Sequence, residues 1–141
     1  KIMDQTFYLS NIAPQVGVGF NRDKWNDLEK EVRYLAKKND NTWVCTGPLY
    51  LPRREADNKL YVRYEVIGNN NVAVPTHFFK VILTEKQGVY TMYSYVLPNQ
   101  PIDNSTPLQN FLVPIDSIER AAGFFIFEKI PRNKIKYLNP K

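Results

Sequence analysis

The chain has 141 residues, of which 43% are hydrophobic and 13% aromatic, and its formal net charge is +5. This length and composition predict one globular domain with its own core, and they exclude an intrinsically disordered chain. No run approaches the roughly 18 apolar residues of a transmembrane helix, so we expect no membrane span. The single cysteine, Cys45, excludes an intrachain disulfide and is interpreted as a small core residue. The positive charge suits a polyanionic partner, but many proteins are equally basic.

The first predicted elements are a short strand and a helix. Residues 6–10 alternate weakly in polarity, which favours a strand, and a loop containing Pro and Gly follows. From about residue 22 to residue 38 the pattern becomes helical. Its apolar stripe comprises Trp25, Leu28, Val32, Leu35 and Ala36. Asn21 precedes this helix and is of a residue type that caps helix N-termini.

The rest of the chain is predicted to be rich in strands. Four β-branched or aromatic runs, bounded by Gly, Pro and Asn turn signals, predict strands at residues 43–51, 60–67, 72–84 and 90–97. Their short connections favour antiparallel neighbours. A second helix is predicted at residues 115–122, stopped by Gly123. The predicted fold class is therefore α+β, an antiparallel sheet with packed helices, in a single domain covering residues 1–141.

Several motifs resemble the DNA/RNA non-specific endonuclease family. The most specific are Leu-Ser-Asn-x-x-Pro-Gln at residues 9–15 and Asn-x-x-x-Trp-x-x-Leu-Glu at residues 21–29. Further matches bring the similarity to about residues 4–127, and the mitochondrial members of the family are the most similar. This resemblance implies a ββα-metal nuclease fold, in which residues 6–10 are the second strand of the metal finger and residues 22–38 are its helix.

Half of the expected active site is missing from the chain. In this family the general-base His lies in an Asp-Arg-Gly-His motif upstream of the matched residues, and the 141 residues contain no such motif. The chain is therefore expected to be the larger, C-terminal part of a nuclease domain. The N-terminal segment with the catalytic His would come from the same gene product or from another chain, and this chain alone would be inactive.

The resemblance implies a Mg²⁺ cofactor, with Mn²⁺ as an alternative ion. Asn21 matches the metal-holding Asn of the family. A single amide oxygen is a sensible anchor because Mg²⁺ keeps most of its waters and phosphate oxygens complete its shell. The alternative is that Asn21 is only a helix N-cap, and one side-chain oxygen would hardly serve both roles.

Glu29 and Arg33 are the candidate catalytic residues in the chain. Glu29 matches a family glutamate that holds a metal-bound water, and Arg33 matches an arginine near the site, where it could clamp a phosphate. The alternative is a surface ion pair between these two side chains, four residues apart on the helix. Eight residues of straight helix separate Asn21 from Glu29 by about 12 Å. Asn21 must therefore lie in an irregular lead-in, or Glu29 must act through water.

Asn11, Gln15 and Arg22 are the candidate substrate-binding residues. For Asn11 and Gln15 the alternative is ordinary hydrogen bonding within a loop. A larger set of basic residues could follow a phosphate backbone, although solvated surface is the default for most: Arg22, Lys24, Lys30, Lys37, Lys38, Arg53 and Arg54. His77 is the only histidine and lies among bulky neighbours in a predicted strand, so it is interpreted as structural.

The sequence therefore predicts a Mg²⁺-dependent, sugar-non-specific endonuclease that hydrolyses phosphodiester bonds in DNA and RNA. The alternatives are a catalytically inactive paralogue that binds nucleic acid or an inhibitor, and a purely structural or dimer-forming fragment. Retention of Asn21, Glu29 and Arg33 together favours the enzyme. The resemblance further suggests a homodimer, a protein inhibitor as a partner, and a mitochondrial intermembrane-space location with release to the nucleus.

Overall fold

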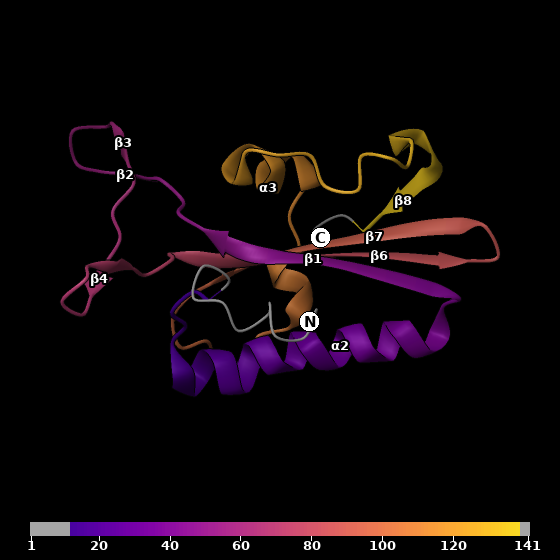
Figure 1. Cartoon of the computed structure of the whole chain (residues 1–141), viewed down its shortest axis with the longest axis horizontal. Coiled ribbons are helices and arrows are strands. Elements are labelled where there is room, and N and C mark those ends of the chain that lie inside the picture. Colours follow the sequence, from indigo (N-terminus) through magenta and orange to yellow (C-terminus); the bar gives the residue numbers. More distant parts are fainter. Residues whose placement is uncertain (1–11, 139–141) are drawn as a thin grey trace.

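A four-stranded sheet forms the centre of the computed structural model, which describes residues 12–138. Its strands lie in the order β1 (Asn41–Leu49), β6 (His77–Lys86), β7 (Val89–Pro98) and β8 (Ile135–Tyr137). The first three are antiparallel neighbours, whereas β8 runs parallel to β7. Helices α2 (Trp25–Lys38) and α3 (Ile115–Ala122) lie on opposite faces of this sheet (Figure 1). The predicted α+β fold class is confirmed.

The sheet separates two apolar layers. Phe78 and Ile82 of β6 belong to the α2-side core, with Trp25 and Leu28 of the helix. On the other face lies the α3-side core, which consists of Leu49, Phe79, Val81, Leu83, Met92, Ile115, Ile118, Ile126 and Ile135. Because a helical layer covers each face, β6 has a nearly continuous apolar sequence instead of an alternating one.

The predicted apolar stripe of α2 is nearly right. Trp25, Leu28 and Leu35 are buried, and Val32 packs partly buried against them. Ala36 is exposed, so it does not share the buried side of the predicted stripe. It lies on the edge of the stripe in the last turn, so the helix rotates it away from the sheet.

The predicted start of the helix is wrong. Regular α-helix begins at Trp25, and Gly17–Lys24 form an irregular π-type lead-in, η2, with a kink at Val18 and Gly19. Gly19 has a φ of 82°, a conformation that glycine adopts without steric cost. Asn21 lies inside this lead-in, and neither segment has a side-chain cap at its N-terminus. The prediction that Asn21 is an N-cap is therefore wrong.

Two predicted strands are also corrected. Residues 60–67 do not form one strand but contribute β3 (Leu60–Tyr61) and β4 (Val66–Ile67). These short strands pair with β2 (Arg53–Arg54) and β5 (Val72–Ala73), respectively. The predicted strand at residues 72–84 is split between β5 and β6 around Pro75, which has no N–H to donate to a ladder.

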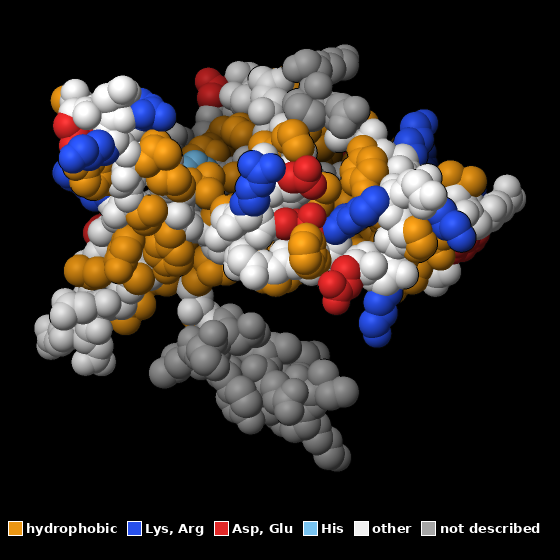
Figure 2. Space-filling model, turned by 90° about the horizontal axis from the view of Figure 1, so that it is seen from above, with side chains coloured by type: hydrophobic (Ala, Val, Ile, Leu, Met, Phe, Trp, Pro, Cys, Tyr) orange, Lys and Arg blue, Asp and Glu red, His pale blue; other side chains and the backbone are white. Residues whose placement is uncertain are grey.

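Residues 50–76 form an arm that projects beyond the sheet (Figure 1). Figure 2 shows the face covered by α3, where apolar side chains gather over this arm at the left of the view. The exposed apolar residues of the arm include Leu60, Tyr61, Val62, Tyr64, Val66, Ile67 and Val72. The arm therefore presents apolar surface that no described element covers.

The C-terminal part combines one confirmed helix with three elements absent from the prediction. Helix α3 has the predicted bounds, and Gly123 ends it with a φ of 82°. The 3₁₀ turns η3 (Leu108–Phe111) and η4 (Arg132–Lys134), with β8, were not predicted because segments of three or four residues carry little periodicity. Within the described residues, no helix has the length and apolar character needed to cross a membrane. The predicted strand at residues 6–10 and Asn11 lie outside those residues.

Candidate functional site

A pocket of about 580 Å³ opens on the α2 side of the sheet. The loop before η2, the first turns of α2 and the ends of β1 and β6 form its walls, and part of the arm closes one side. Gln15 and Glu29, which the sequence singled out, both line it. Lys80 lines it as well. An amide, a carboxylate and an ammonium group therefore share one concave surface.

Asn21 joins this site through a hydrogen bond to Gln15. Its Nδ2 donates to Gln15 Oε1, and its backbone N–H donates to the Val16 carbonyl at 3.0 Å. No donor among the described residues bonds the Asn21 Oδ1. The bond to Gln15 thus orients the amide, and its Oδ1, which no described group bonds, could accept a cation.

The loop that carries Gln15 is fixed from the opposite side by Asn99. Its Oδ1 accepts the Val16 N–H at 2.8 Å, and its Nδ2 donates to the carbonyls of Pro14 and Pro75 at 3.1 and 2.9 Å. No local pattern signals this role, because Asn99 follows a strand 83 residues after Val16. Asn99 thereby holds the Gln15 loop against the start of β6.

Glu29 is half-buried on one edge of α2, one turn after Trp25. No ion pair joins it to Arg33, and no described donor bonds its carboxylate, whereas neighbouring Lys30 bonds Asp27 at 3.0 Å. The alternative of a surface Glu29–Arg33 pair therefore finds no support here. The carboxylate of Glu29 remains available to the pocket.

Two other predicted site residues lie outside this pocket. Arg22 and Arg33 are exposed and do not line it. The fold therefore does not place them in the same pocket as Gln15 and Glu29. Asn11 lies outside the described residues. The site as described therefore consists of Gln15, Asn21 and Glu29, with exposed arginines on the same helical segment.

Lys80 is a site residue that the sequence reasoning missed. Only 6% of it is exposed, and its Nζ lies 4.6 Å from the centroid of the Trp25 ring. Burial lowers the pKa of Lys80, and the negative charge of Glu29 acts in the opposite direction. The available signal was its position within β6, where a lysine interrupts an otherwise apolar run.

Lys24, which was grouped with basic residues that could follow a phosphate backbone or simply be solvated, is instead a structural residue. It is 3% exposed, and its Nζ donates to the carbonyls of Asn104 and Thr106, each at 2.9 Å. Helix α2 and its lead-in are thereby tied to the loop after β7. This correction arises because the partner carbonyls lie 80 residues away in sequence.

His77 is half-buried at the start of β6, and its Nδ1 lies 2.8 Å from Thr76 Oγ1. Burial lowers the pKa of this imidazole. It lines a different pocket, together with Arg53 and Arg63, and does not line the one that contains Glu29. Its position agrees with the structural interpretation.

Mg²⁺ fits the donor groups at this site. Among the described residues, no group of three His, Cys, Asp or Glu side chains gathers to hold a metal. The Oδ1 of Asn21 and the carboxylate of Glu29, which no described residue bonds, are instead hard oxygen donors. Mg²⁺ prefers such ligands and takes few of them from the protein, so Asn21 can serve as its anchor.

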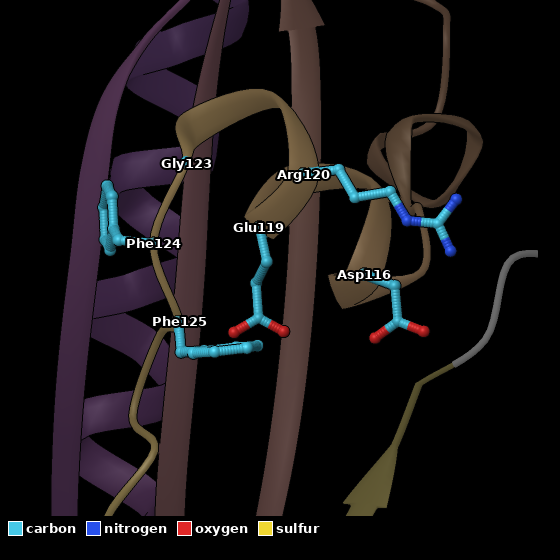
Figure 3. Close-up of a pocket in the computed structure, with 6 residues that line it drawn as sticks. All are labelled: Asp116, Glu119, Arg120, Gly123, Phe124 and Phe125. Carbon is cyan, nitrogen blue, oxygen red and sulfur yellow. The ribbon is translucent and has the colours of Figure 1, made fainter.

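A second pocket, of about 390 Å³, lies at the end of α3 on the opposite face of the sheet. Figure 3 shows Glu119 pointing toward the ring of Phe125 there, while Arg120 points away from it. Glu119 already accepts the Ile126 N–H at 2.6 Å and a bond from Arg132 at 2.7 Å. Its carboxylate is thus committed to structure, and this pocket is a weaker candidate for chemistry.

The chain is similar to a known protein family and to individual curated proteins. The model of the DNA/RNA non-specific endonuclease family matches residues 1–133. The mitochondrial endonuclease G of Caenorhabditis elegans is 56% identical over 136 residues, which cover 95% of this chain and 44% of that protein. The mitochondrial endonuclease G of Homo sapiens is 56% identical over 131 residues, covering 92% and 44%.

A solved structure is also similar to this chain. The crystal structure of an EndoG/EndoGI complex, which describes a mechanism of EndoG inhibition, superposes with a TM-score of 0.91 at 58% identity. The match covers 98% of this chain and 57% of that one. The chain thus spans less than half the length of the two curated relatives and little more than half of the solved chain.

Proposed function

This chain belongs to the DNA/RNA non-specific endonuclease family, and from that premise we propose that it is the larger, C-terminal part of a Mg²⁺-dependent nuclease domain. The proposed reaction is hydrolysis of phosphodiester bonds in DNA and RNA. The observation that carries the proposal is the hydrogen bond from Asn21 to Gln15 beside the pocket that contains Glu29. It joins the two matched motifs, which lie on either side of the kink in η2.

Asn21 is the proposed metal anchor and Gln15 its support. Gln15 accepts the Asn21 Nδ2–H, so the amide presents Oδ1 to the ion and cannot rotate without losing that bond. When bound, Mg²⁺ stabilises the negative charge that develops on the phosphate and on the leaving 3′ oxygen. Asn21 lies in the irregular lead-in, after its kink at Val18 and Gly19, and Glu29 acts at the metal through water.

The remaining side chains act on water and on substrate. Glu29 accepts a hydrogen bond from a water at the site and orients it. The general-base His, from the segment outside this chain, takes a proton from the attacking water as its oxygen bonds to phosphorus and the bond to the 3′ oxygen breaks. Arg33 clamps phosphate oxygens with its guanidinium group. Asn11 and Arg22 contact the substrate backbone.

The assembly and location of the protein are part of the proposal. The relatives from Caenorhabditis elegans and Homo sapiens are both named as mitochondrial, and we extend that location to this chain, with the intermembrane space as its site and the nucleus after release. We also propose that it functions as a homodimer. The EndoG/EndoGI complex supports a protein inhibitor as a further partner.

Cleavage assays test this function directly. The full-length gene product is expected to cut plasmid DNA and RNA with Mg²⁺ and to stop when a chelator is added, whereas the 141-residue chain alone should cut neither. Nucleic-acid binding without cleavage by the full-length protein would support the inactive paralogue instead. Cleavage by the chain alone that disappears in His77→Ala would show that His77, not an external residue, is the base.

A further inference from the structure

The position of Lys80 is unusual for a lysine. It lies in the interior of β6, and on the same face of that strand Phe78 and Ile82 are buried in the α2-side core. A strand covered on both faces favours apolar residues at such a position. An ammonium group loses hydration there and destabilises the fold unless other groups compensate for that loss.

The described surroundings of Lys80 compensate only in part. Its Nζ lies 4.6 Å from the centroid of the Trp25 ring, which provides a cation–π contact. No hydrogen-bond acceptor among the described residues lies within bonding distance of Nζ. The contrast with Lys24 is direct, because that buried lysine donates to two carbonyl oxygens. The described residues therefore leave donors of Lys80 unused where it lines the pocket.

The pocket provides space for an anion at this point. Lys80 and Glu29 line the same cavity of about 580 Å³, yet no ion pair joins them. Burial lowers the pKa of Lys80, and the negative charge of Glu29 offsets only part of that lowering. The ammonium group consequently faces a cavity that also receives the amide of Gln15, the residue bonded to the proposed metal anchor.

We propose that Lys80 binds a backbone phosphate of the nucleic acid from the floor of this pocket, as a substrate-binding residue beside Asn21 and Glu29. The inference rests on the proposed nuclease function and adds a contact to it. A phosphate oxygen accepts from any of the three ammonium donors and does not require the planar geometry that arginine recognises. Such a contact carries no base information, which suits a nuclease without sequence preference.

Oligonucleotides with one neutral methylphosphonate linkage at a time identify the contact. Binding to the full-length protein is measured in a chelator, which prevents cleavage, with wild type, Lys80→Met and Lys80→Arg. Lys136→Met is the matched control, because that lysine is exposed on the edge strand β8. We expect Lys80→Met to bind an unmodified strand about tenfold more weakly. The salt dependence of its binding should lose about one unit of slope.

The decisive result concerns a single linkage. Wild type and Lys80→Arg should lose affinity when that linkage is neutral, and Lys80→Met should be insensitive to it. A folded Lys80→Met with wild-type affinity and wild-type sensitivity at every linkage would overturn the inference, although the protein would still be a nuclease. If Lys80→Met fails to fold, Lys80→Gln is measured under the same criteria. A wild-type protein that binds no oligonucleotide would instead reject the proposed function itself.

Discussion

The two faces of strand β6 serve different purposes. Toward α3 it presents Phe79, Val81 and Leu83, all buried in the α3-side core. Toward α2 the buried positions Phe78 and Ile82 alternate with Lys80 and Thr84, which are buried but polar. The α3-side face therefore contributes mainly to stability. The α2-side face contains buried polar groups beside the candidate site, and these groups reduce its contribution to stability.

Two glutamates repeat this contrast. Glu119, on the α3 side, accepts hydrogen bonds from Ile126 and Arg132 on its Oε2, so its carboxylate is tied to neighbouring groups. Glu29, on the α2 side, accepts none from the described residues although it is half-buried and lines a pocket. A half-buried carboxylate that no described residue bonds is a poor stabilising element and a suitable ligand for water or substrate. The hydrogen-bond partners of each glutamate, more than the residue type, distinguish the structural side from the candidate site.

The largest expected effect is a loss of stability from the α3-side core. Leu83 is 1% exposed, and Leu83→Ala should lower the free energy of unfolding by about 3 kcal/mol, because the removed atoms leave a cavity. Turnover by the folded protein should change little. Denaturant unfolding and cleavage assays of the full-length protein measure both quantities. A large fall in turnover with normal stability would contradict the conclusion that the α3-side face contributes mainly to stability.

Asn21→Ala should have the opposite signature. Loss of the metal anchor is expected to lower kcat by about 100-fold or more, because the ion acts where charge develops in the transition state. Asn21 is exposed and caps no helix, so the free energy of unfolding should change by less than about 0.5 kcal/mol. Parallel losses of DNA binding, turnover and thermal stability would identify Asn21 as a structural residue of the lead-in.

Gln15→Ala should reproduce this effect more weakly. Gln15 touches the proposed anchor and not the metal, and loss of such a supporting bond typically costs about tenfold in metal affinity or activity. Higher Mg²⁺ concentrations should restore much of the activity in a titration of turnover. Gln100→Ala, at an exposed glutamine outside this pocket, should leave the Mg²⁺ dependence unchanged. Identical Mg²⁺ titrations for both variants would show that Gln15 does not support the metal anchor.

Lys80→Met sharpens the comparison because it makes the α2-side face of β6 more like the other face. Removal of a poorly compensated buried charge should raise the free energy of unfolding by about 1 kcal/mol, while the substrate contact is lost. The midpoint of urea unfolding at neutral pH measures the gain. A lower midpoint would mean that the Trp25 contact outweighs the lost hydration and that Lys80 is itself a structural element.

The smallest effect concerns His77 and pH. Burial lowers the pKa of this imidazole below its ordinary 6.5 in the folded state, so the unfolded chain binds the proton more readily. The stability contribution is fully present above pH 6.5 and is lost as pH falls toward the lowered value. His77→Gln should flatten the dependence of unfolding midpoints on pH in that window. An unchanged slope would show that other groups cause it.

Local patterns in the sequence determined much of the framework. The stripe of Trp25, Leu28 and Leu35 predicted α2, and Gly123 fixed the end of α3 at the predicted residue. The motifs around Gln15 and Asn21 indicated the family that the comparison with known proteins confirmed. These features depend on residues that are near one another in the chain, so periodicity, capping chemistry and motif spacing are sufficient to find them.

Only the tertiary structure decided which distant groups meet. Lys80 and Glu29 line the same pocket because the sheet that pairs β6 with β1 packs against α2. No pattern near residue 80 predicts that α2 is the neighbour of this part of β6. Likewise, Lys24 is buried by carbonyls 80 residues away, and β8 pairs with β7 through only three residues. Sequence periodicity predicts which side chains share one face of an element. Tertiary packing determines which groups lie opposite that face, and the chemistry of the site depends on those opposing groups.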